Sequence, residues 1–132
     1  MIDQKTAPYA VLILRVALGV MFIAHSAYLK VFVFTLPGTA QFFESLGLPG
    51  FTAYVVVAAE TLGGLLLILG VGTRWVSLAL VPILLGATWV HSGNGWVFSA
   101  ENGGWEYPLF LTVAGIALAL TGPGALALDN RK

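Results

Sequence analysis

Cysteine is absent from the 132-residue sequence, and charged residues make up only 9% of it. The absence of cysteine excludes disulfides, thiol catalysis, thiolate zinc sites and iron–sulfur clusters. Six basic and six acidic residues give a formal net charge of zero, and no basic cluster is present that would neutralise nucleic-acid phosphates. Nucleic-acid binding is therefore excluded. Soluble domains have roughly 25% charged residues, so the charged fraction of this chain is far below theirs. Hydrophobic residues make up 58% of it.

The hydrophobic residues fall into four runs that predict membrane-spanning helices. A bilayer core about 30 Å thick requires roughly 20 mostly apolar residues per helix. Four segments meet or approach this length, at about 8–29, 51–72, 75–90 and 105–120. Too few polar residues remain to coat the surface of a soluble protein. The predicted fold is therefore all-α: a single domain over residues 1–132 that forms an integral membrane four-helix bundle.

Turn and breaker residues mark the ends of these runs. Pro8 suits the first turn of a helix, Pro49 and Gly50 precede the second run, and Gly122-Pro123 ends the fourth. The short turn at 72–74 predicts that the second and third runs form an antiparallel hairpin. Arg15 interrupts the apolar part of the first run, which argues against a cleaved signal peptide.

The distribution of charge predicts an orientation. With four spans, both termini and the turn after the second span share one side of the membrane. That side carries four basic residues: Lys5, Arg74, Arg131 and Lys132. The other side carries one basic residue and three acidic ones: Lys30, Glu44, Glu101 and Glu106. The positive-inside rule then places the termini in the cytoplasm and both longer loops on the outer side of the membrane, which is periplasmic if the protein comes from a Gram-negative cell.

Both longer loops contain aromatic residues. In the first loop, the apolar and polar residues of TAQFFESLGL (residues 39–48) form an amphipathic pattern. This pattern predicts a short helix lying at the membrane interface. The second, HSGNGWVFSAENGGWEYP (residues 91–108), is rich in glycine and can turn tightly. Trp96, Phe98 and Trp105 are expected to anchor it at headgroup level, where Trp96, Trp105 and Tyr107 would form the mouth of a site.

Ionisable residues inside the predicted spans mark the candidate site, because a charge at mid-membrane costs several kcal/mol. Arg15 lies about 10 Å into the first span and Glu60 roughly 13 Å into the second, at 1.5 Å per residue. The long side chain of Arg15 could bridge the remaining difference in height between Arg15 and Glu60. One interpretation is a structural Arg15–Glu60 ion pair; the other is that Glu60 accepts protons or contacts a ligand while Arg15 biases its charge.

Three further titratable side chains are expected near the outer ends of the spans, namely His25, His91 and Glu106. Together with Glu60 beneath them they would line one shallow polar layer. Such a layer could hold a quinone headgroup, a transition metal bound by His25 and His91, or a haem between the same two histidines. The residues leave these three chemistries open. Gly19, Gly63 and Gly64 are expected to serve close helix packing.

Several of these residues together resemble the DoxX family of small bacterial membrane proteins, in the wider group that contains the DoxD subunit of thiosulfate:quinone oxidoreductase. The resemblance covers nearly the whole chain. Its motifs are Arg15, Val16, Gly19, Phe22 and His25 in the first span, Lys30 and Phe32 after it, FFESLGLP, Ala59-Glu60 with Gly63-Gly64, Gly70 with Thr73-Arg74, His91, NGWVF and GGWEYP. Ser26 stands where the family commonly has glycine, which puts the shape of the outer mouth in question.

The resemblance implies a four-helix membrane protein associated with redox and quinone-linked processes, with a second subunit in the thiosulfate reaction. The leading hypothesis is a quinone-interacting or accessory subunit of a membrane redox system, in contact with lipid and with a partner subunit or a second copy of itself. His25, Glu60, His91 and Glu106 would line the site. The alternatives are a non-enzymatic structural subunit of a larger membrane complex, and a protein that binds a metal or a small solute.

Overall fold

A computed structural model describes residues 1–96 and 104–130, and all regular structure in these residues is helical. The predicted all-α class is confirmed. Two predictions rest on residues outside the described ranges: the anchoring role of Phe98, and the charge contributions of Glu101, Arg131 and Lys132.

The chain forms five α-helices within the described residues, together with three shorter helical segments. The α-helices are α1 (Ala7–Ile23), α2 (Leu36–Ser45), α3 (Phe51–Leu69), α4 (Thr73–His91) and α5 (Glu106–Thr121). The shorter segments are the π-helical η1 (Ala24–Val33) and the 3-10 turns η2 (Ser92–Asn94) and η3 (Leu128–Asn130). By length and composition, three segments are able to cross a membrane: α1 with η1, α3, and α4 with η2. α5 is a shorter apolar helix of 16 residues.

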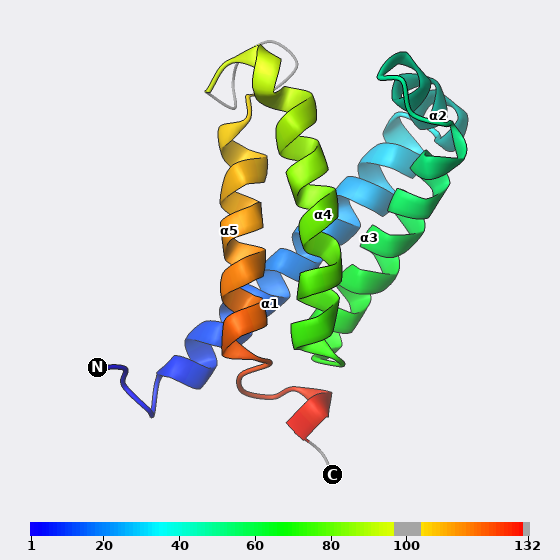
Figure 1. Cartoon of the computed structure of the whole chain (residues 1–132). Helices are drawn as coiled ribbons and strands as arrows, with labels where there is room; N and C mark the ends of the chain where they lie inside the picture. The colour runs from blue at the N-terminus through cyan, green and yellow to red at the C-terminus, as the bar shows by residue number, and fades with distance from the viewer. Residues whose placement is uncertain (97–103, 131–132) are drawn as a thin grey trace.

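The long helices are arranged as two pairs. α1 packs along α3, and α4 packs along α5 (Figure 1). Both termini lie at the same end as the α3–α4 turn, which we call the terminal end. α2 and η2 lie at the opposite end, which we call the loop end (Figure 1). The chain therefore runs back and forth between these two ends, as the predicted spans required.

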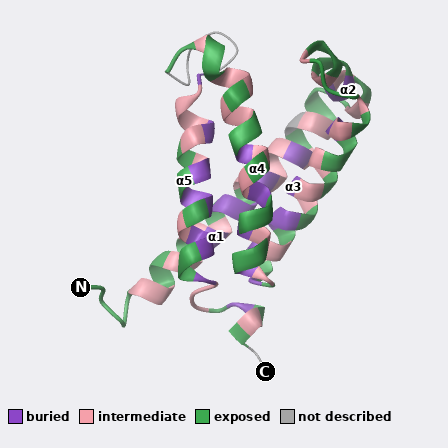
Figure 2. Cartoon of the chain, in the orientation of Figure 1, coloured by how far each residue is buried: buried purple, intermediate pink, exposed green. Residues whose placement is uncertain are grey.

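The outer faces of all four long helices are apolar. Buried positions face the neighbouring helices, whereas exposed positions cover the outside (Figure 2). The exposed side chains include Ile13 of α1, Leu62 of α3, Trp75 of α4 and Leu120 of α5. Contiguous apolar surface of this extent is unfavourable in water and normal in lipid. The fold is therefore that of a membrane protein.

Glycines bring the first pair of helices into backbone contact. A Cβ atom added at Gly19 of α1 would lie 2.7 Å from the carbonyl oxygen of Gly64, and one at Gly64 would lie 2.7 Å from the carbonyl oxygen of Gly19. On the other face of α3, a Cβ at Gly63 would lie 2.9 Å from a methyl group of Leu80. The predicted packing role of these three glycines is confirmed.

The helix of the first long loop begins three residues before its predicted start. Thr35 caps α2, because its hydroxyl accepts a hydrogen bond of 3.1 Å from the backbone N–H of Gly38. Thr39 and Ala40 face the protein, whereas Phe42 is exposed. The predicted first span also differs: the helix does not end near residue 29 but continues as η1 to Val33.

The segment after α5 folds back across the terminal end. The Asp129 carboxylate accepts hydrogen bonds from the backbone N–H groups of Gly72 (2.9 Å) and Thr73 (3.3 Å), at the start of α4. The backbone N–H of Asp129 donates to the Gly70 carbonyl at 2.9 Å. A carboxylate at a helix N-terminus is stabilised by the free N–H groups and the helix dipole. Asp129 thus fastens the C-terminal segment to the α3–α4 turn.

Candidate functional site

Arg15 is fully buried, with 0% of its surface exposed, and it contacts backbone carbonyls. Its guanidinium donates to the carbonyls of Leu67 and Ile68 at 2.7 Å each, to Pro123 at 2.8 Å and to Ala125 at 2.9 Å. Carbonyls at the C-terminal end of a helix have no partner within the helix and carry partial negative charge. The predicted Arg15–Glu60 ion pair is therefore wrong, because Arg15 instead ties α1 to the end of α3 and to the C-terminal segment.

Glu60 pairs with Lys30, 2.5 Å from the ammonium group. The Glu60 side chain is 6% exposed and that of Lys30 is 21% exposed. A lysine near the end of a membrane helix ordinarily extends toward the interface. Here it turns inward to a carboxylate near the middle of α3, which compensates both charges away from water. Lys30 was overlooked as a partner, although the sequence offers it as the one cation predicted on that side of the membrane.

Two more polar contacts hold η1 in place. The Thr61 hydroxyl donates to the Ser26 hydroxyl at 2.8 Å, and the side chain of Ser26 is completely buried. The hydroxyl of Thr39 in α2 bonds the backbone carbonyl of Lys30 at 3.2 Å. Ser26, the departure from the family pattern, therefore joins η1 to α3 by a side-chain hydrogen bond. A π-helix within an α-helix is often found at functional sites, and η1 carries both His25 and Lys30.

His25 lies against Tyr107 of α5. The two rings are stacked with centroids 5.9 Å apart and planes inclined by 26°. The Nδ1 atom of His25 is 2.8 Å from the Met21 carbonyl oxygen. Because a carbonyl can only accept, Nδ1 carries the proton of this bond. The Tyr107 hydroxyl is buried and has no hydrogen-bond partner among the described residues.

His91 ends α4 and forms the same local bond, from Nδ1 to the Ala87 carbonyl at 2.8 Å. Among the described residues, no group of three or more His, Asp or Glu side chains is arranged to hold a metal ion. The structure therefore does not gather His25, His91, Glu60 and Glu106 into one metal-binding cluster. It brings His25 to Tyr107, next to Glu106 in sequence, and gives Glu60 a different partner.

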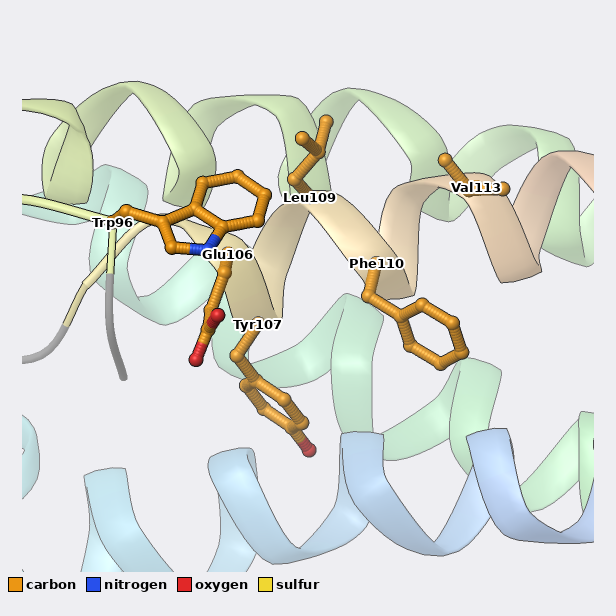
Figure 3. A pocket seen from close by; sticks show the side chains of 6 residues that line it. All are labelled: Trp96, Glu106, Tyr107, Leu109, Phe110 and Val113. Atoms are coloured by element: carbon orange, nitrogen blue, oxygen red, sulfur yellow. The ribbon is translucent and has the colours of Figure 1, made fainter. Parts of the chain in front are cut away.

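A groove of about 470 Å³ runs along α5 at the loop end (Figure 3). Its lining residues are Trp96, Glu106, Tyr107, Leu109, Phe110 and Val113. Tyr107, Phe110 and Val113 follow one another at three-residue spacing and share a face of the helix. In Figure 3 the side chain of Tyr107 points from α5 toward α1, with its hydroxyl foremost. Phe110 is 68% exposed and Val113 57% exposed, so the groove opens sideways where lipid would lie.

Trp96 lines the groove at the loop end, and Trp105 packs against it. Trp96 and Trp105 pack edge to face, with ring centroids 4.3 Å apart. Backbone bonds of 3.1 Å run from Trp105 to Gly95 and from Glu106 to Trp96. Of the three residues predicted to form the mouth of a site, Trp96 and Tyr107 line the groove, and Trp105 contacts Trp96; their role as a mouth stays a prediction. Sequence reasoning missed Leu109, Phe110 and Val113; the signal for Phe110 and Val113 was their three-residue spacing after Tyr107.

The fold defines a helical membrane protein with a largely apolar groove along α5, lined in part by Tyr107. The DoxX family profile matches residues 10–93 of the chain. The chain belongs to the DoxX family.

Three relatives match over almost the full length of the chain. A protein of Bacillus subtilis (strain 168) named "Putative oxidoreductase CatD" is 38% identical over 126 residues, covering 96% of this chain and 89% of that protein. The "Inner membrane protein YqjF" of Escherichia coli (strain K12) is 30% identical over 96% of this chain and 95% of its own length. The "Inner membrane protein YphA" of the same organism is 33% identical, with 94% and 91% covered. No solved structure gives a significant match.

Proposed function

We propose that this chain is a four-span protein of the bacterial inner membrane that binds a quinone ring in the groove beside Tyr107. In this role it is a quinone-interacting or accessory subunit of a membrane redox system. The observation that carries the proposal is the buried Tyr107 hydroxyl, which has no partner among the described residues and belongs to a side chain that lines a groove of about 470 Å³. An unpartnered buried hydroxyl costs stability unless a ligand or water satisfies it.

The shape and lining of the groove suit such a ligand. Ligand sites typically enclose about 300–1,000 Å³ and combine apolar walls with a few polar groups. Trp96 and Tyr107 offer aromatic surface to a flat ring, and the Tyr107 hydroxyl is a hydrogen-bond donor for a ring carbonyl. Phe110 and Val113 continue the groove toward the lipid side, where an isoprenoid tail would lie.

The names of the relatives are compatible with a redox role in the inner membrane, and they name no ligand. One relative is named an oxidoreductase and two are named inner membrane proteins. In the proposed assembly the electrons pass through a partner subunit, and this chain positions the quinone. Glu60 is assigned a structural role in the proposal, because Lys30 occupies its carboxylate.

The test measures quinone binding to the purified protein in lipid nanodiscs. A short-chain benzoquinone is added, and the quenching of tryptophan fluorescence reports how much is bound. We expect Tyr107→Phe to weaken binding about tenfold, because it removes one buried hydrogen bond. Tyr54→Phe, which removes an exposed hydroxyl from α3, is the matched control and should bind like the parent protein. Equal affinities for parent and Tyr107→Phe would contradict the proposed site, and no binding to any of the three would favour a purely structural subunit.

A further inference from the structure

We infer that residues 122–128, which follow α5, lie within the membrane leaflet at the terminal end and contact the acyl chains of its lipids. Leu126 and Leu128 are the side chains that make this contact. The segment lies at the opposite end of the molecule from the groove lined by Tyr107 (Figure 1), so the inference does not depend on quinone binding.

The composition of the segment and the length of α5 agree with a place inside the leaflet. Residues 122–128 read GPGALAL and contain no polar side chain. α5 has 16 residues and extends about 24 Å at 1.5 Å per residue, about 6 Å less than a typical hydrocarbon core. The residues that follow so short a span must cover the remaining thickness. Asp129, the first charged residue after α5, bonds the backbone N–H groups of Gly72 and Thr73.

Contacts of the backbone place the segment level with the end of a membrane span. Arg15, which donates to the carbonyls of Pro123 and Ala125, also donates to those of Leu67 and Ile68 in the last turn of α3. Arg15 itself lies about 10 Å into the first span, at 1.5 Å per residue. The two carbonyls of the segment therefore lie beside the last turn of α3 and not beyond it.

Further backbone groups of the segment are also bonded within the protein. The N–H of Ala125 donates to the Pro8 carbonyl at 3.0 Å, and the side-chain amide of Asn130 donates to the Gly124 carbonyl at 2.8 Å. The N–H of Asn130 donates to the Ala127 carbonyl at 3.1 Å. Irregular backbone at membrane depth is tolerated only where the protein itself bonds its polar groups. With the two bonds from the guanidinium, the segment comes close to meeting this condition.

Leu126 adopts a strained backbone conformation and is exposed. Its φ of 56° lies in the left-handed region that favours glycine, and its side chain is 80% exposed. Leu128 is 43% exposed, whereas Ala127 between them faces the protein. These three residues and Asn130 line a groove of about 370 Å³. In water an exposed, strained leucine would carry two costs, whereas in lipid the favourable environment of its side chain offsets the strain.

The experiment introduces single thiols into the cysteine-free chain and attaches a nitroxide spin label to each. The labelled proteins are placed in nanodiscs of phosphatidylethanolamine and phosphatidylglycerol. Collisions of the label are measured with oxygen, which concentrates in lipid, and with a water-soluble nickel chelate. Leu120→Cys, on the exposed last turn of α5, is the lipid reference, and Gln4→Cys is the water reference. We expect Leu126→Cys and Leu128→Cys to lose most of the nickel relaxation seen at Gln4→Cys and to match Leu120→Cys in oxygen relaxation.

Two results would overturn the inference. Nickel relaxation as strong as at Gln4→Cys would place the segment in water, and weak relaxation by both reagents would mean that a protein surface, such as a second copy of the chain, covers it. Should Leu126→Cys disturb the fold, as judged by thermal melting, Leu128→Cys decides, because its backbone does not have a positive φ. Neither result bears on quinone binding, which the comparison of Tyr107→Phe with the parent protein tests separately.

Discussion

The buried Arg15 and the partly buried Lys30 are satisfied in different ways. Arg15 has four bonds to backbone carbonyls, whereas Lys30 pairs with the carboxylate of Glu60. The planar, multi-donor guanidinium suits several carbonyls at once, and the flexible lysine suits a single point of contact. Both arrangements leave no formal charge exposed to the apolar interior, and both connect helices that are distant in sequence.

The Lys30–Glu60 pair gives a prediction at the scale of single residues. Glu60→Met leaves an uncompensated ammonium group near mid-membrane, and Lys30→Met leaves an uncompensated carboxylate. Each should lower the free energy of unfolding by roughly 2 kcal/mol, a value reduced because Lys30 is partly solvent-accessible. The double substitution should cost less than either single one, since two apolar side chains then meet. Unfolding by denaturing detergent measures all four proteins, and a double-mutant cost equal to the sum of the singles would show that the two residues do not interact.

At the scale of residues, the sequence showed which polar side chains lie inside the helices, but not which groups they bond. Arg15, Glu60 and His25 stand out because polar side chains are rare in apolar runs. The bonds of Arg15 could not be predicted, because backbone carbonyls have no sequence signature and the end of α3 meets Pro123 and Ala125 only in the folded chain. Tyr107 was expected at the mouth of the site, but its unpartnered hydroxyl depends on how its ring stacks on His25.

At the scale of elements, hydrophobic runs predicted the helices. A chain segment in lipid must satisfy its backbone N–H and C=O groups by internal hydrogen bonds, and a helix does so. The ends were less accurate where a local bond decides them. Thr35 begins α2 three residues early, and η1 prolongs the first helix through Val33 because Ser26 and Lys30 both find partners on α3. A π-helix has no compositional signal of its own.

The glycine contact between α1 and α3 supports a prediction for these two elements. Gly19→Ala would place a methyl group 2.7 Å from the Gly64 carbonyl oxygen, and backbone cannot move aside without separating the helices. We expect a loss of about 1–3 kcal/mol in the free energy of unfolding. Gly86→Ala in α4 is the control, because nothing lies within 4 Å of its added Cβ, and it should be neutral or gain up to about 1 kcal/mol from helix propensity. Equal effects of the two substitutions would show that the close approach does not contribute to stability.

For the whole molecule, the length of α5 and the position of the segment after it bear on the number of membrane crossings. Its 16 residues extend about 24 Å at 1.5 Å per residue, short of a typical core but within what local thinning of the bilayer accommodates. The C-terminal segment supports a crossing, because Arg15 bonds the Ala125 carbonyl and Asp129 bonds the turn before α4. Those contacts hold the segment after α5 at the terminal end, and the helix must return there from the loop end.

The absence of cysteine allows this topology to be tested directly, because any introduced thiol is the only one in the chain. Gln4→Cys and Asn130→Cys report on the terminal end, and Gly93→Cys reports on the loop end. Leu62→Cys, on the exposed face of α3, is the control for a thiol in lipid. In spheroplasts, a membrane-impermeant maleimide should label only Gly93→Cys. Gln4→Cys and Asn130→Cys should react after lysis, and Leu62→Cys should stay unlabelled. Labelling of Asn130→Cys but not of Gln4→Cys without lysis would mean an odd number of spans. Labelling of both terminal reporters but not Gly93→Cys would reverse the orientation, and the groove along α5 would then lie toward the cytoplasmic side of the membrane.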